Sequence, residues 1–259
     1  MLPGCIPFES RPLRHAVDEN RRMNTLQTEH HRLYYTEASA FFTPDGRVRS
    51  LVLELTGPAN WGALSQVWRG VQSELELPAP AIAVNGVDGY QLWFSLAIPV
   101  ESALAGVFLE GLRKRYLADV AASRVRLWPT PDAAAPEGWR HATLVPALQA
   151  STQHWSALVA PDLAAIFEEE PWLDLTPSAE AQASVLAGLQ SIKPAQFQRA
   201  LEMLRSVDPA PTEAPQVSAP MAFEAREPRT FLLEVMNNPS VPLPLRIEAA
   251  KALLPHAKN

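Results

Sequence analysis

The sequence predicts an α+β fold, and the main evidence is the order of strands and helices expected between residues 47 and 128. Residues 47–56 (RVRSLVLELT) alternate between two faces, as a strand does. Residues 61–76 place apolar side chains at spacings of three and four after Asn60, a favourable N-cap, and so predict a helix. Composition agrees, because 47% of the 259 residues are hydrophobic, which is typical of a folded globular chain.

The next segments extend this pattern. Residues 81–84 and 90–98 read as strands on either side of residues 85–89 (NGVDG), whose asparagine and glycines favour a hairpin turn. Residues 101–117 predict a second helix with basic side chains in its last turn, and residues 124–128 (RVRLW) predict another strand. The order strand–helix–strand–strand–helix–strand is the split βαβ, or ferredoxin-like, arrangement.

The flanking segments differ in character from this core. Extended structure is expected at the start of the core, around Leu33 to Phe42, and helices are expected to start at Pro161, Pro177 and Pro194. The predicted organisation is an irregular N-terminal arm (1–30), an α+β core (31–150), a helical region (151–207), a proline-rich linker (208–229) and a short helical tail (230–259).

Composition and charge exclude several classes of protein. A single cysteine, Cys5, excludes an intramolecular disulfide framework and a multi-cysteine zinc site. The formal net charge of −6 argues against a surface built throughout to neutralise phosphates, although a local basic groove stays possible. Met1–Ser10 lacks the features of a secretory signal, and no apolar run reaches the roughly 20 residues of a membrane span. A soluble, cytoplasmic protein that does not associate with membranes is therefore expected.

Three segments carry a resemblance to a known family: LVLELTGP (51–58), AIAVNGVDGYQLWFSL (81–96) and RVRLWPTP (124–131). Together they resemble the archaeo-eukaryotic primase–polymerase superfamily, with members from phage and plasmid replication closest. The resemblance implies an RRM-like βαββαβ sheet. It also implies an active site in which clustered carboxylates hold two Mg²⁺ or Mn²⁺ ions against nucleotide phosphates.

The motifs of that family are degraded in this chain. At the acid–x–acid motif the matching positions are Glu54 and Thr56, and Gln91 stands where the family has a strand histidine that contacts the incoming triphosphate. Asp119 is the nearest carboxylate to the third motif, and Asp88 lies on the turn. Glu54, Asp88 and Asp119 are therefore the catalytic candidates, without a complete motif. No metal site and no cofactor are predicted, and Mg²⁺ or Mn²⁺ is expected only if the protein is catalytic.

A second set of residues suits contacts with nucleic acid. The arginines near the last core strand would contact phosphates, and aromatic rings on the sheet would stack on bases. The predicted nucleic-acid-binding residues are Arg124, Arg126, Tyr90, Gln91 and Trp93, with Trp128 as a further stacking surface. The alternative is that the tryptophans pack beneath helices and the arginines are solvated or paired with Glu54 or Asp88.

The C-terminal tail carries a weaker resemblance. Residues 231–256 (FLLEVMNNPSVPLPLRIEAAKALLPH) resemble a segment near the ends of phage-related proteins, including some terminase small subunits. This implies a phage or mobile-element context, with a replication or phage protein as the partner of residues 230–259.

These observations predict a non-catalytic, primase-like protein of a phage or mobile element that binds nucleic acid or a replication partner. One alternative is a protein-interaction adaptor without a nucleic-acid role. The other is an active metal-dependent nucleotidyltransferase that uses Glu54 with Asp88 or Asp119.

Overall fold

The computed structural model describes residues 25–36, 40–134 and 138–205, and residues 233, 236, 246, 247 and 251 nearer the C-terminus. The chain divides into two compact units, Met1–Asp208 and Pro209–Asn259. The predicted linker and most of the predicted tail lie outside the described residues. In the second unit, the Arg246 guanidinium donates a hydrogen bond to the Met236 carbonyl at 2.9 Å.

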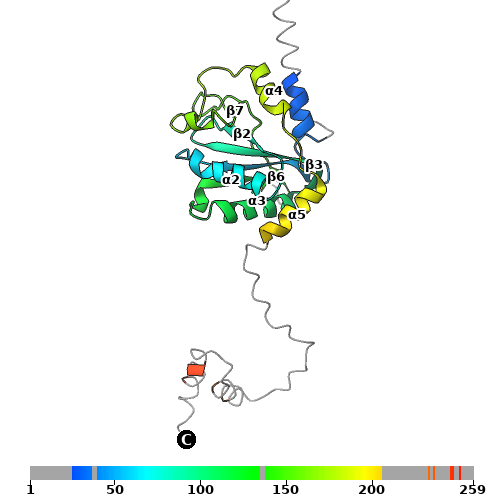
Figure 1. Ribbon diagram of the computed structural model, residues 1–259, viewed down its shortest axis with the longest axis vertical. Coiled ribbons are helices and arrows are strands. Elements are labelled where there is room, and N and C mark those ends of the chain that lie inside the picture. The colour runs from blue at the N-terminus through cyan, green and yellow to red at the C-terminus, as the bar shows by residue number, and fades with distance from the viewer. Residues whose placement is uncertain are drawn as a thin grey trace, which may run out of the picture. The chain divides into compact units, whose positions relative to one another are not determined.

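The first unit is an α+β structure around a five-stranded antiparallel sheet, which confirms the predicted fold class (Figure 1). The strands lie in the order β4-β1-β3-β2-β7. Their bounds, in chain order, are β1 (Arg47–Leu55), β2 (Ala81–Val84), β3 (Tyr90–Glu101), β4 (Val125–Trp128) and β7 (Ala157–Val159). A separate two-stranded ladder joins β5 (Thr130–Pro131) to β6 (Trp139–Arg140).

One face of the sheet packs against three helices, α2 (Trp61–Ser73), α3 (Ser102–Tyr116) and α5 (Pro194–Arg205) (Figure 1). The predicted N-cap of α2 is present, because the Asn60 side chain accepts a hydrogen bond from the Ala63 amide at 2.8 Å. Alternate residues of β1, including Leu51 and Leu53, point into this larger core and are fully buried. Burial of this apolar layer is the main stabilising contribution on this face.

The other face of the sheet is also covered over much of its area. A helix over residues 25–33 and α4 (Ala179–Ala187) lie on this side, next to β7 and β2 (Figure 1). Leu33 and Leu186 from these helices form a second buried cluster with Val52 and Trp93 of the sheet. A polar hollow remains on this face near β4 and the ends of β1 and β3.

Two expectations about local structure are wrong. The segment predicted to be extended from Leu33 instead follows a helix over residues 25–33, which also falls across the boundary expected between the arm and the core. The helix expected after Pro161 is only a single 3₁₀ turn, η2 (Ala164–Phe167). In both places the packing against the sheet decides the local structure, because propensity is a weak preference that tertiary contacts override.

Burial of His30 makes stability depend on pH. His30 is only 5% exposed against the sheet, its Nε2 has no hydrogen-bond partner among the described residues, and desolvation lowers its pKa from 6.5 to about 4. The neighbouring His31 lowers the pKa further, whereas the Val145 backbone and Glu29 raise it. The folded state therefore binds fewer protons than the unfolded chain between these two pKa values.

We expect the free energy of unfolding to fall as the pH drops from about 6.5 to 4, by on the order of 3 kcal/mol from His30 alone. Urea unfolding of the wild type and of His30→Gln at a series of pH values measures this contribution. The exposed neighbour provides the control: His31→Gln removes one of the smaller contributions to the His30 pKa, so most of the pH dependence is expected to persist in this variant. An equal pH dependence in wild type and His30→Gln would contradict the assignment.

Candidate ligand-binding site

A polar pocket of about 240 Å³ lies on the sheet face opposite α2 and α3, where β3, β1 and β4 run side by side. We call it the sheet pocket. Its lining includes the charged and polar side chains on which the site depends, together with one tryptophan: Glu54, Asn85, Asp88, Gln91, Arg126, Trp128, Arg140 and His141. It brings together residues from β1, β3, β4, β6 and the turn between β2 and β3.

A fixed network of hydrogen bonds holds the acidic wall of the pocket. Glu54, on β1, is 5% exposed, and its Oε1 accepts a hydrogen bond from Asn85 Nδ2 at 2.9 Å. Its Oε2 accepts from the Trp128 indole at 3.3 Å. Asn85 Nδ2 also donates to Asp88 Oδ1 at 3.2 Å, so that one amide group bridges the two carboxylates. Each carboxylate is thus held in place by a neutral donor.

The turn between β2 and β3 is built to hold Asn85 in this orientation. Asn85 Oδ1 accepts hydrogen bonds from the backbone amides of Val87, Asp88 and Gly89, each at 2.9 Å. Three backbone donors identify this atom as the oxygen, which leaves Nδ2 to face the carboxylates. Gly86 adopts a φ of +79°, a conformation that side chains disfavour, so the glycine predicted for this turn is required there.

Gln91 lies beside Glu54 and is also held rigidly. The two residues are directly paired across β1 and β3, so their side chains lie on the same face. The Trp93 indole donates a hydrogen bond to Gln91 Oε1 at 2.8 Å. Gln91 is 6% exposed, and among the described residues its Nε2 has no acceptor. The pocket therefore contains a fixed amide donor beside a fixed carboxylate.

Two arginines supply positive charge to the pocket. Arg126 lies opposite Glu54 in the β1–β4 register, and Arg140 comes from β6. Both side chains are exposed, and within the described ranges neither forms an ion pair with an acidic side chain. Unpaired guanidinium groups beside hydrogen-bonding side chains favour a ligand that carries a phosphate or carboxylate.

Arg124, predicted with Arg126, lies elsewhere. Its guanidinium donates to the backbone carbonyls of Thr56, Gly57 and Pro58, and so fixes the loop that follows β1. The Thr56 hydroxyl donates to the Arg124 carbonyl at 3.0 Å, which gives this residue of the degraded motif a structural role. Asp119 is exposed in the turn after α3 and does not line the pocket.

Two of the three aromatic residues predicted to stack on bases, Tyr90 and Trp93, are buried. Tyr90 points to the α2 side of the sheet, where its hydroxyl donates to the Ala164 carbonyl at 2.7 Å. Trp93 is 2% exposed and packs against Tyr34 with ring centroids 5.2 Å apart. Neither ring presents a face to solvent. Trp128 is only partly buried and lines the pocket.

The imidazole ring of His141 forms one wall of the sheet pocket. The sequence pattern does not predict His141 as a site residue. Its ring stacks on Phe41, with centroids 4.0 Å apart, and its Nε2 lies 3.0 Å from both the Ser50 carbonyl and the Ser50 hydroxyl. Burial lowers the pKa of His141, so the ring is favoured in its neutral form. Its role here is to close one side of the pocket.

The pocket does not offer the ligands that two-metal chemistry needs. In the described part of the chain, no three His, Cys, Asp or Glu side chains gather in a way that could hold a metal ion. Within the pocket, the Asn85 amide nitrogen occupies the space between the carboxylates of Glu54 and Asp88. The arrangement is suited to binding by hydrogen bonds and charge.

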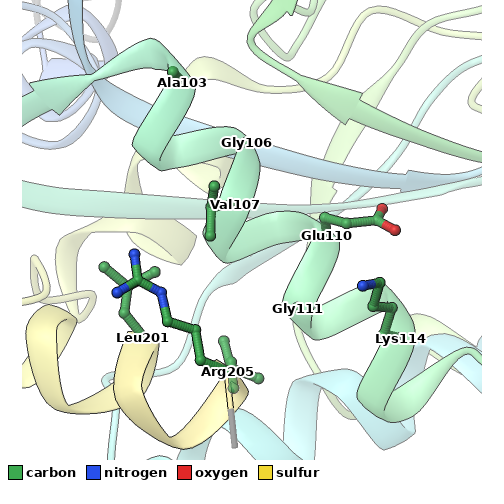
Figure 2. A pocket seen from close by; sticks show the side chains of 9 residues that line it. Ala103, Gly106, Val107, Glu110, Gly111, Lys114, Leu201 and Arg205 are labelled. Atoms are coloured by element: carbon green, nitrogen blue, oxygen red, sulfur yellow. The ribbon is translucent and has the colours of Figure 1, made fainter. Parts of the chain in front are cut away.

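A larger hollow, of about 430 Å³, lies between α3 and α5 (Figure 2). Its floor is formed by small and apolar residues such as Gly106, Val107 and Leu201, with Glu110, Lys114 and Arg205 at its edge. Figure 2 shows Arg205 alongside Leu201 on α5, and Glu110 and Lys114 on the last turns of α3. Its lining contains no cluster of converging hydrogen-bonding groups comparable with that of the sheet pocket.

No protein-family model matches the chain, and no curated protein matches it. Among the described residues, no helix combines the length and apolar character needed to cross a membrane. The described residues of the first unit form an α+β domain with a polar pocket on its sheet.

Proposed function

We propose that this chain is a non-catalytic, primase-like protein of a phage or mobile element, and that it binds nucleic acid through the sheet pocket. The observation that carries the proposal is the proximity of two exposed arginines, Arg126 and Arg140, which form no ion pair within the described part of the chain, to a rigid hydrogen-bonding wall around Glu54 and Gln91. Arginine side chains bind phosphate, and fixed polar groups recognise base edges.

The arrangement of the sheet supports the RRM-like, ferredoxin-like part of the proposal. The element order β1–α2–β2–β3–α3–β4 and the spatial order β4-β1-β3-β2, with every neighbouring pair antiparallel, are what that arrangement requires. In RRM domains, single strands bind on the exposed sheet face. Here the sheet pocket is the polar part of the corresponding face.

The state of the carboxylates supports a non-catalytic role. Both oxygens of Glu54 are engaged by neutral donors, Asp88 shares one of those donors, and Asp119 lies outside the pocket. Primer extension with Mn²⁺ examines this part of the proposal. Incorporation of nucleotides that is lost in Glu54→Ala would contradict it and favour the active nucleotidyltransferase.

Fluorescence anisotropy with labelled single-stranded DNA tests binding itself. Arg126→Gln is expected to weaken binding by about ten-fold at low salt and to reduce the slope of log affinity against log salt by about 1, because one phosphate contact is lost. Arg69→Gln provides the matched control, since Arg69 is also exposed but lies on α2, beneath the other face. Equal losses in the two variants, or no binding by the wild type, would contradict the proposal.

The partner proposed for residues 230–259 is a replication or phage protein. The support for it is the resemblance of residues 231–256 to a segment of phage-related proteins; in the second unit the side chains of Leu233 and Ile247 are 41% and 46% exposed.

A further inference from the structure

The chemistry of the Glu54–Gln91 pair indicates which base the sheet pocket would accept. Asn85 and Trp128 each donate one hydrogen bond to a different oxygen of the Glu54 carboxylate. A carboxylate oxygen can accept two hydrogen bonds, so each Glu54 oxygen retains one acceptor site. Glu54 can therefore receive two further N–H donors side by side.

Gln91 adds a donor next to these two acceptors, and its orientation is not ambiguous. An indole N–H can only donate, so the Gln91 atom that lies 2.8 Å from Trp93 Nε1 must be the amide oxygen. The amide nitrogen is then left without an acceptor among the described residues, on a side chain that is 6% exposed and lines the pocket. This nitrogen is not among the fully buried, unpaired side-chain atoms of the described residues, so it is accessible from the pocket and available to donate to a ligand there.

We propose that the Glu54–Gln91 pair recognises a single unpaired guanine, with its phosphate held by Arg126 and Arg140. Guanine has adjacent N1–H and N2–H donors, which fit the two oxygens of Glu54, and an O6 acceptor, which fits the Gln91 amide. On the Watson–Crick edge, adenine, cytosine and thymine each have only one N–H donor position, and it lies next to an acceptor. One Glu54 oxygen would then receive no hydrogen bond from these bases. If this guanine is part of a single-stranded nucleic acid, the inference rests on the proposed function.

The size of the pocket supports a single base. Its volume of about 240 Å³ lies below the roughly 300–1,000 Å³ typical of pockets for drug-sized ligands. The rest of this sheet face is covered by the helix over residues 25–33, by α4 and by the ring of His141. One splayed-out base fits this space, whereas a run of stacked bases does not.

The same chemistry occurs in a guanine within a single strand and in a free guanine nucleotide, and one experiment separates the two. Labelled oligothymidylates with a single central guanine, inosine, adenine or cytosine are titrated with the protein, and GMP and AMP are tested separately by calorimetry. We expect the guanine oligomer to bind about ten-fold more tightly than the adenine and cytosine oligomers. Inosine, which lacks the N2 amino group, is expected to lie between them.

Two variants test the assigned residues. Glu54→Gln removes one acceptor, and Gln91→Glu keeps the acceptor for Trp93 while it replaces the donor that faces O6. Each is expected to abolish the preference for guanine, whereas Glu202→Gln, on the exposed side of α5, is expected to retain it. The indole N–H region of the ¹⁵N NMR spectrum is compared between each variant and the wild type, and matching signals verify that the variant is folded.

Each outcome has a distinct meaning. Equal binding of all four oligomers by the wild type overturns the guanine inference and leaves the proposed function standing. Binding of GMP in preference to AMP without binding of any oligomer supports guanine recognition and overturns the nucleic-acid role. Binding of neither overturns both, and a guanine preference that survives in both variants overturns the assignment to Glu54 and Gln91.

Discussion

Replacement of Gly89 by alanine is expected to lower the free energy of unfolding by about 3 kcal/mol. A Cβ atom at this position would lie 2.0 Å from the Leu55 carbonyl oxygen, far inside contact distance. The obstructing atom belongs to the backbone of β1, which is paired on both sides, so it has little freedom to move. The clash would also displace the turn that orients Asn85, whose Oδ1 accepts from the Gly89 amide.

Gly106 provides the matched control for this substitution. A Cβ atom there would meet nothing within 4 Å, and the residue lies within α3. Gly106→Ala is expected to leave stability unchanged or to raise it by about 0.5–1 kcal/mol, because alanine favours helix more than glycine does. Urea unfolding at neutral pH measures both variants. A Gly89→Ala protein as stable as Gly106→Ala would show that the close approach of β1 to the turn is not as described.

The second large effect is expected for Trp93→Ala, with a loss of about 3–5 kcal/mol. Trp93 is 2% exposed, and its ring contacts Tyr34, Phe41 and His141, with centroid distances of 5.2, 6.3 and 5.7 Å. Its removal would leave a cavity between the sheet and the segments that cover it. It would also release the Gln91 amide, since the indole hydrogen bond fixes that group.

Trp139→Ala is the control for this prediction. Trp139 lies on β6, is partly exposed and belongs to neither buried cluster, so its loss is expected to cost less than about 1 kcal/mol. Thermal or urea unfolding of both variants makes the comparison. Similar losses for the two tryptophans would contradict the view that Trp93 joins the covering segments to the sheet.

The strands and helices between residues 47 and 128 could be predicted because their signals are local. Alternation in β1, the Asn60 cap of α2 and the glycine turn before β3 each lie within a few neighbouring residues. β7 carries no such signal, because it is three residues long. It is held by pairing with β2, and by the Gln182 side chain, which accepts from the Leu158 amide at 2.6 Å and donates to the Leu158 carbonyl at 3.1 Å.

The sequence pattern does not indicate the helix over residues 25–33, because the buried side of that helix includes the polar residue His30. His30 and Tyr34 lie on the side that packs on the sheet, and the aromatic residues that follow favour extended structure in isolation. This omission has a consequence for the site. Without the covering helix, Trp93 is expected to be exposed on the sheet, whereas the structure buries it.

The candidate site could be predicted in part. Glu54, Asp88, Gln91 and Arg126 were identified from the core strands and their turn, and the structure brings these four into one pocket. Arg140 and His141 follow a proline-rich break. Their position depends on contacts distant in sequence, such as the stacking of His141 on Phe41. No local pattern carries that information.

The most direct test of the central claim is the indole N–H spectrum of the ¹⁵N-labelled protein during titration with single-stranded DNA. The chain has seven tryptophans, of which Trp128 donates to Glu54 inside the pocket and Trp68 donates to the Pro80 carbonyl on the α2 side. Substitution by phenylalanine assigns each signal. We predict that DNA shifts the Trp128 signal, leaves the Trp68 signal in place, and has a much weaker effect on Arg126→Gln. A Trp128 signal that does not move while the DNA is demonstrably bound would contradict the account.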